Sequence, residues 1–164
     1  GEDLSLYNER TFDRCVANMC LMITGNALTM LQQTYRVLKT NGISVWSIWG
    51  HRERGMVFES IEAVMHSINE ELGTKSVSSG FATRSNYYLG DNMTNTVRLF
   101  KRAGFRQVMH WSVDVALPVN TAEQWSDAWR IAPSFEAVLK KCKDDAQREK
   151  VERMFTDGIE RRFK

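Results

Sequence analysis

The sequence predicts an α/β fold, because two runs rich in β-forming residues flank a segment with helical periodicity. The two runs are residues 12–19 and 43–49, and the helical segment covers residues 26–39. Two strands joined by a helix of this length form a βαβ unit, whose strands are parallel and whose crossover is right-handed. We therefore expect a parallel sheet at the centre of the fold.

The joints of this unit carry their own signals. Residues 24–26 end the first run with Thr, Gly and Asn, which supply capping oxygens for a helix start. Apolar residues then recur at helical spacing, namely Leu28, Leu31, Tyr35 and Leu38. Asn41-Gly42 is predicted to end the helix, because both residues tolerate the left-handed conformation of a C-cap.

A polar loop with His51 follows the second strand, and ligands of open α/β sheets bind at such strand ends. The apolar spacing predicts a helix over residues 56–72, stopped by Gly73, and another over 92–103, capped by Asp91 and ended by Gly104. Residues 74–90 between them are rich in Ser and Gly, which predicts a long irregular loop.

The remaining chain predicts one more strand and then helices. Over residues 106–116, apolar and polar side chains alternate, which is typical of a strand with one wetter face. Residues 121–163 are predicted to be a helical segment, with capping signals at Thr121–Gln124 and Asp144–Gln147 and a break at Pro133. We expect residues 1–164 to form a single domain.

Composition limits the classes of partner. The chain has 164 residues with 22 basic and 20 acidic side chains, a formal net charge of +2, which gives no electrostatic case for nucleic acid. No apolar run approaches about 20 residues, and the N-terminus has no signal-peptide pattern, so we expect no membrane span. Three cysteines without C-x-x-C spacing indicate thiols in a reducing, cytoplasmic (intracellular) compartment and no metal site.

Several motifs together resemble one enzyme family. They are Phe12-Asp13-Arg14, Asn18–Met22, Met30-Leu31, Tyr35-Arg36-Val37-Leu38-Lys39-Thr40-Asn41-Gly42, Leu89-Gly90-Asp91 and Ala103-Gly104-Phe105. This pattern resembles class I S-adenosylmethionine-dependent methyltransferases, and most of all the type 11 branch related to the ubiquinone and menaquinone enzymes. The resemblance covers nearly the whole chain and implies a Rossmann-like sheet, with a helical cap segment after the third strand.

The departures from the family pattern imply that this chain is a partial methyltransferase. The first three strands, the G-x-G-x-G loop that cradles the cofactor and the acidic residue that binds its ribose have no counterpart here. The antiparallel strand that would follow Lys164 in the family is also missing. We therefore expect only the later strands of the family sheet, that is, the carboxyl-terminal half of the enzyme. Binding of S-adenosylmethionine would then require the missing amino-terminal half.

The resemblance assigns candidate residues for the cofactor, and residue type and position suggest candidates for the acceptor site. Ala17, Asn18 and Met19, which close the first strand, would line the methionine end of the cofactor, although packing within the sheet is the other interpretation. His51 is the candidate general base. The other interpretation is that it is a solvated histidine of a surface loop. Candidates for an apolar acceptor pocket are Trp49, Phe81, Tyr87 and Tyr88, with Trp49 also a candidate for the core. Cys15 and Cys20 have no base motif nearby and are rejected as nucleophiles.

Two functions stay open at this point. One is methyl transfer from S-adenosylmethionine to a small-molecule acceptor. The alternative is a non-catalytic methyltransferase-like module for binding or scaffolding, which has lost the cofactor loop. In both cases the strand at residues 12–19 would have an uncovered edge. We expect another polypeptide to cover it, either the missing amino-terminal half or a second copy.

Overall fold

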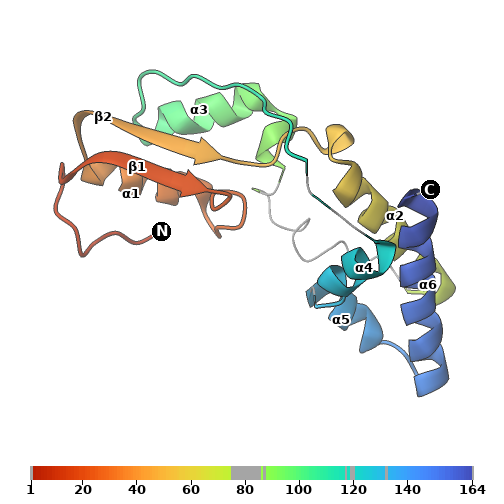
Figure 1. Cartoon of the computed structure of the whole chain (residues 1–164). Helices are drawn as coiled ribbons and strands as arrows, with labels where there is room; N and C mark the ends of the chain where they lie inside the picture. The colour runs from red at the N-terminus through yellow and green to blue at the C-terminus, as the bar shows by residue number, and fades with distance from the viewer. Residues whose placement is uncertain are drawn as a thin grey trace. The chain divides into compact units, whose positions relative to one another are not determined.

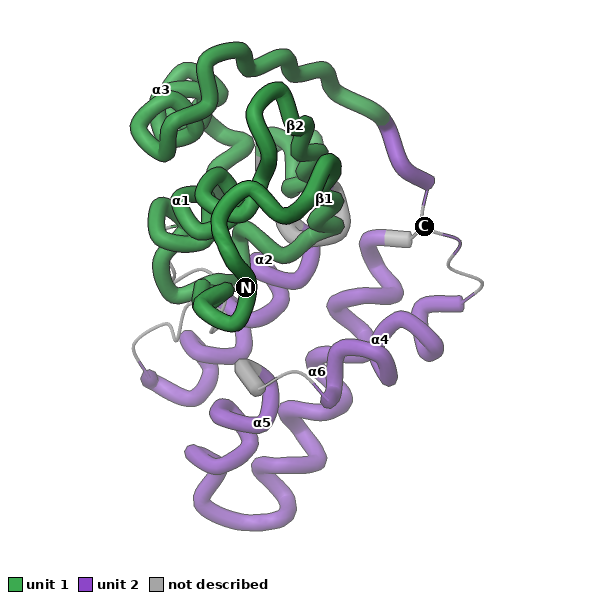
Figure 2. Tube along the Cα trace, turned by 90° about the vertical axis from the view of Figure 1, so that its left-hand side faces the viewer, with its two compact units in different colours: residues 1–54, 84–113 green, residues 55–83, 114–164 purple. Residues whose placement is uncertain are grey.

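The computed structural model describes residues 2–74, 86, 88–116, 118, 121–131 and 133–163. It divides into two compact units, residues 1–54 with 84–113 and residues 55–83 with 114–164 (Figure 2). Each unit has its own hydrophobic core and is described by itself. The prediction of a single domain over residues 1–164 stays a prediction.

The first unit contains the predicted strand–helix–strand arrangement (Figure 1). Strand β1 (Phe12–Asn18) leads to helix α1 (Ala27–Val37) and strand β2 (Leu38–Ser47), and the two strands pair in parallel. Two short 3-10 helices, η1 (Arg52–Arg54) and η2 (Leu89–Asp91), and helix α3 (Met93–Ala103) complete the unit. The α/β class and the parallel strands are therefore confirmed, while the larger Rossmann-like sheet stays a prediction.

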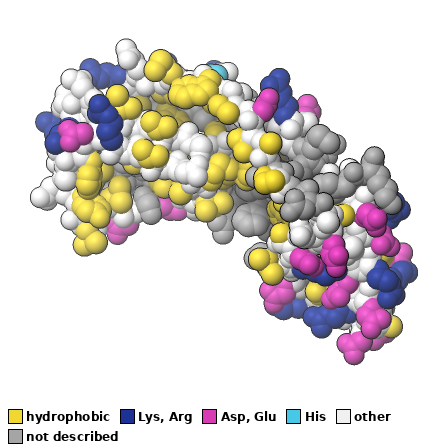
Figure 3. Space-filling view, viewed as in Figure 1, with side chains coloured by type: hydrophobic (Ala, Val, Ile, Leu, Met, Phe, Trp, Pro, Cys, Tyr) yellow, Lys and Arg dark blue, Asp and Glu magenta, His cyan; other side chains and the backbone are white. Residues whose placement is uncertain are grey.

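The helices cover one face of this small sheet. Leu21, Ala27, Leu31 and Ala103 form the buried core of the unit, and Trp46 of β2 packs against it with its ring 6.1 Å from that of Phe100. On the opposite face, Val16, Ile43 and Val45 are exposed, by 77%, 52% and 50%. In Figure 3 hydrophobic side chains accordingly gather on the visible surface of the region that holds the sheet. No described residue covers this face.

Asn41-Gly42 does not end helix α1, so this prediction is wrong. The helix stops at Val37, because Leu38 takes an extended backbone with ψ 137° and pairs at once with Phe12. Asn41 has a φ of 64°, and a Cβ on Gly42 would lie 2.9 Å from the Lys39 carbonyl oxygen. The dipeptide instead makes the irregularity in β2 that separates the Leu38 pairing from the Ile43 pairing.

The prediction of a third strand over residues 106–116 is also wrong. The structure describes all of these residues. The segment is extended, but it has no strand partner among the described residues. Its apolar residues are exposed, namely Met109, Trp111, Val113 and Val115. Alternation reports which residues suit a half-buried strand, but a strand forms only when a neighbour supplies the ladder of hydrogen bonds. The helical cap segment therefore follows an unpaired segment.

The second unit is helical. Its helices are α2 (Met56–Glu71), α4 (Ala122–Arg130), α5 (Pro133–Leu139) and α6 (Asp145–Phe163). Thr121 Oγ1 accepts from the Gln124 amide (3.1 Å), and Asp144 Oδ1 accepts from the Gln147 amide (2.7 Å), so both predicted caps are confirmed. Gly158 interrupts the apolar stripe of α6 because a Cβ there would lie 2.8 Å from Val64 of α2. The core comprises Ile61, Val64, Met65, Ile68, Phe135, Val138, Val151, Phe155 and Ile159.

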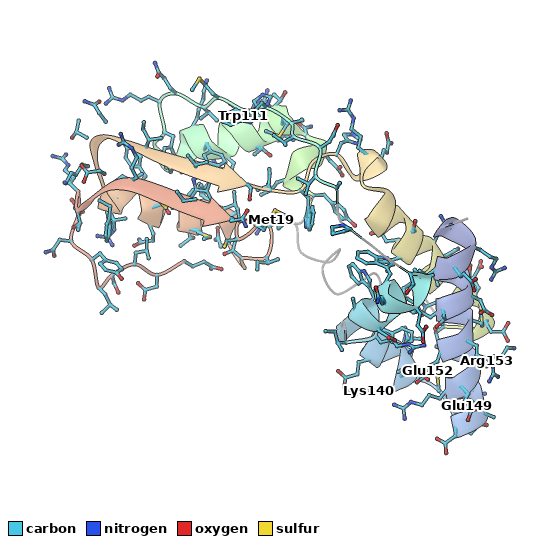
Figure 4. The ribbon with its side chains drawn as sticks, viewed as in Figure 1. Met19, Trp111, Lys140, Glu149, Glu152 and Arg153 are labelled. Atoms are coloured by element: carbon cyan, nitrogen blue, oxygen red, sulfur yellow. The ribbon has the colours of Figure 1, made fainter. Side chains whose placement is uncertain are left out.

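The outward surface around α5 and α6 has charged side chains of both signs, as expected for a solvated face. Lys140 pairs with Glu136 (2.7 Å), and Arg153 lies 3.6 Å from Glu149. These pairs are exposed, and Figure 4 shows Lys140, Glu149, Glu152 and Arg153 spread over this surface. Exposed pairs of this kind contribute little to stability.

Candidate functional site

The carboxyl ends of the two parallel strands are tied together by polar groups. The Met19 amide donates to the carbonyl oxygen (3.1 Å) and to Oγ (3.0 Å) of Ser47, and the Ser47 hydroxyl donates to Oδ1 of Asn18. Met19 lies just beyond the end of β1 (Figure 4) and has a φ of 54°. A non-glycine residue in this left-handed region is uncommon and turns the chain sharply out of the strand. The side chain of Asn18 is thereby fixed at the strand end.

A groove of about 500 Å³ opens beside β1 in the first unit. Two of the three predicted cofactor residues, Ala17 and Asn18, line it, whereas Met19 does not. Its other lining residues come from β1, β2, α1 and the segments before and after β1, namely Glu2, Leu4, Cys15, Val16, Cys20, Ile23, Thr24, Met30, Thr34 and Trp46. The buried indole nitrogen Nε1 of Trp46 has no hydrogen-bond partner among the described residues. Asn18 is thus a polar side chain at the strand end that a ligand in the groove could contact.

The N-terminal segment forms one wall of this groove. Arg36 of α1 holds the segment through the carbonyl oxygens of Leu4 (2.8 Å) and Tyr7 (3.0 Å). Farther back, the Glu2 carboxylate accepts from the Thr24 hydroxyl and from the Gly25 amide (2.6 Å), immediately before the start of α1. The hydrogen bond from Thr24, followed by those from Gly25 and Asn26, lowers the pKa of Glu2 below its ordinary value.

We predict that acid releases Glu2 from its contact at the start of α1. Because the folded-state pKa of Glu2 is depressed, the contact favours the folded arrangement above the ordinary carboxyl pKa of about 4.3 and is lost as the pH falls through the folded value. In an NMR titration, the Gly25 amide should shift in this acidic range, and the shift should vanish in Glu2→Gln. Glu9→Gln, which changes an exposed carboxylate of the same segment, is the matched control and should leave the Gly25 titration in place. A Gly25 shift that survives Glu2→Gln would contradict the assignment.

His51 does not line the groove. It is exposed in the loop after β2, where its carbonyl oxygen accepts from the Arg54 amide (3.0 Å) and its Nδ1 lies 3.9 Å from Oε2 of Glu53. An exposed pair at that distance fixes the imidazole only weakly. The assignment of His51 as general base therefore stays a prediction with no support from the groove.

The predicted acceptor pocket is only partly described. Phe81 and Tyr87 lie outside the described residues. Trp49 and Tyr88 are both half-buried, and Gly90 approaches the Trp49 carbonyl group so closely that a Cβ on Gly90 would overlap it. The structure thus brings the ends of the two segments together, while the pocket itself stays a prediction.

Two contacts of the site were missed from the sequence. Ser47 was not singled out, although a polar residue at the end of a parallel strand is the signal that could have found it. Glu2 lies 22 positions before its partner Thr24 in the sequence, and no local sequence pattern predicts such a contact.

The described residues and the comparison with known proteins assign no further site or family. Among the described residues, no group of three His, Cys, Asp or Glu side chains is arranged to hold a metal ion, and no helix is long and apolar enough to cross a membrane. Comparison of the chain with protein-family models, with curated proteins and with solved structures found no match.

Proposed function

We propose that this chain takes part in S-adenosylmethionine-dependent methyl transfer to a small-molecule acceptor, as the carboxyl-terminal half of a methyltransferase. The observation that carries the proposal is the polar cluster of Asn18, Met19 and Ser47 at the carboxyl ends of two parallel strands, beside a groove. Ligands of α/β sheets bind at this end of the strands. S-adenosylmethionine is chosen as the ligand because the sequence motifs resemble those of the methyltransferase family.

In this proposal the described residues supply contacts for the methionine end of the cofactor only. Asn18 offers a polar contact at the strand end, and Ala17 leaves room beside it. Glu2 is the acidic residue of the groove, but its carboxylate is engaged by Thr24 and Gly25 and is not free to bind a ribose. The adenosine end would therefore need residues from another polypeptide segment.

In this proposal the protein acts mainly by positioning. S-adenosylmethionine supplies an activated methyl group when bound, and its transfer depends on holding the acceptor in line with that group. Asn18 would orient the methionine end, because its side chain is held by the Ser47 hydroxyl. His51 would remove a proton only from an acceptor that must lose one.

Binding of S-adenosylmethionine to the full 164-residue chain tests this proposal. We expect weak binding, with a dissociation constant above about 0.1 mM, because the groove supplies contacts for one end of the cofactor only. In a titration by NMR up to about 5 mM, shifts should concentrate at the amides of Ala17, Asn18, Met19 and Ser47.

Two variants sharpen this titration. Asn18→Ala should reduce the shifts, whereas Thr40→Ala, an exposed change near the amino end of β2, should leave them unchanged. Absence of shifts at the strand ends would overturn the proposal. Binding in the low micromolar range would overturn the expectation that another segment is required.

A specific observation favours the alternative, a non-catalytic binding or scaffold module. Within the described residues, the outer edge of β1 has no neighbouring strand, and the face with Val16, Ile43 and Val45 is bare. An exposed strand edge recruits other strands. In either function, we propose that another polypeptide covers the edge of β1, either an amino-terminal half or a second copy.

A further inference from the structure

The groove of the first unit runs along the edge of β1. Four consecutive residues line it, namely Cys15, Val16, Ala17 and Asn18. Successive side chains of a strand point to opposite faces, so all four contact one cavity only if the cavity faces the strand's edge. Met30 and Thr34 of α1 and the N-terminal residues Glu2 and Leu4 complete the lining. The groove thus has the form of a slot beside a strand.

The backbone of β1 presents unpaired groups to this slot. The amides of Thr11 and Met19 donate to the carbonyl oxygens of Val37 and Ser47, so the odd-numbered residues of this run direct their backbone groups to β2. In a parallel pair the alternate residues point the other way. Arg14 and Val16 therefore turn their N–H and C=O groups toward the free edge, where the described sheet has no further strand.

The chain also contains an extended segment that belongs to no sheet among the described residues. Residues 107–113 make no hydrogen bond to any described residue. Met109, Trp111 and Val113 alternate along it and are exposed by 85%, 73% and 69% (Trp111 is labelled in Figure 4). Three large apolar side chains on one side of an extended chain are what a strand needs in order to bury one face. The chain thus carries both an open edge and an unpaired strand.

Charges at the two ends indicate the direction of pairing. Arg14 lies near the amino end of β1. The extended segment is preceded by Arg106 and followed by Asp114. An antiparallel arrangement brings Asp114 toward Arg14, whereas a parallel one brings Arg106 toward Arg14, so that like charges meet. Like charges opposite one another destabilise a strand pair.

We propose that the slot beside β1 binds residues 108–114 of a second copy of this chain as an antiparallel strand. In the register set by the charges, Asp114 lies opposite Arg14, Ser112 opposite Val16, and Val113 opposite Cys15. Trp111 and Val113 then point to the side of the slot that holds Met30 and Thr34, and the polar Ser112 and Asp114 point to the other side. This pairing does not depend on methyl transfer, and it selects a second copy over an amino-terminal half.

Disulfide trapping in the full chain tests the register. Cys15 and Val113 would form a pair without mutual backbone hydrogen bonds, whose Cβ atoms lie about 4.5–5.5 Å apart, near the separation of about 3.5–4.5 Å in a disulfide. In a background with Cys20→Ser and Cys142→Ser, Val113→Cys should give a disulfide-linked dimer of about twice 18.9 kDa under mild oxidation. Ser112→Cys, one position away on the opposite face, is the control and should not.

Several outcomes would overturn the proposal. One is equal trapping of Val113→Cys and Ser112→Cys, and another is a disulfide formed within a single chain. A third is a dimer linked through Cys15 in the chain that carries Cys20→Ser and Cys142→Ser only. The last is a chain that light scattering shows as a monomer at about 0.5 mM. A disulfide within one chain would mean that the segment pairs with its own β1. A dimer linked through Cys15 alone would mean that two β1 strands pair instead.

Charge exchange tests the direction independently. Arg14→Asp or Asp114→Arg alone should raise the dimer dissociation constant about two- to fivefold, the range of an exposed ion pair. The double variant should restore the original value, since the pair is then reversed rather than lost. Circular dichroism of each variant confirms that it is folded. Absence of rescue in folded variants would overturn the antiparallel register.

Discussion

Gly90→Ala is expected to destabilise the first unit by more than about 3 kcal/mol. A Cβ at this position would overlap the Trp49 carbonyl oxygen and would lie 2.8 Å from two backbone atoms of Gly50. Both obstacles are backbone, so no side-chain rotation relieves the overlap. η2 is also held from the other side, since the Thr96 hydroxyl donates to the Leu89 carbonyl oxygen (2.6 Å). Urea unfolding followed by circular dichroism measures the loss.

Gly50→Ala provides the matched control for this prediction. Gly50 is the neighbour of Trp49, but a Cβ there would meet no atom within 4 Å. We expect the free energy of unfolding to change by less than about 0.5 kcal/mol. Equal unfolding midpoints for Gly90→Ala and the unchanged chain would show that η2 does not approach the end of β2 so closely. The predicted acceptor pocket around Trp49 and Tyr88 would then lose its structural basis.

The helix and strand types could be predicted from the sequence because they depend on local patterns. Spacing of apolar residues identified β1, α1 and β2, and capping side chains identified the starts of α4 and α6. The end of α1 was misplaced because Asn41-Gly42 suits a C-cap and an irregular strand equally well. Only the pairing of Leu38 with Phe12, a contact across 26 positions, decides between the two.

The segment at residues 106–116 shows a second limit of sequence patterns. Alternation predicts which face of a strand would be buried, but not whether a neighbouring strand exists. The candidate site has the same limit. Asn18 was assigned from the family resemblance, whereas Ser47 and Glu2 became visible only through their contacts with Asn18, Met19 and Thr24.

Phe155→Ala is expected to destabilise the second unit by about 3–5 kcal/mol, the range for truncating a buried aromatic side chain. Phe155 is 1% exposed in the middle of α6, and its ring centroid lies 4.5 Å from that of Phe135 in α5. The neighbouring helices cannot simply close the cavity, because α6 already approaches α2 at Gly158 as closely as Val64 allows. Such a loss is a large part of the about 5–15 kcal/mol that stabilises a typical domain.

Ile131→Ala is the control for this change, since it also removes a large apolar side chain from the second unit but from a position that is 85% exposed. It should alter the free energy of unfolding by less than about 0.5 kcal/mol. Hydrogen exchange of the α6 amides measures both variants, and exchange should accelerate strongly in Phe155→Ala alone. Similar exchange rates in the two variants would mean that Phe155 does not anchor α6. The core would then have to depend on the smaller aliphatic contacts of Val151 and Ile159, which flank Phe155 on the same face of the helix.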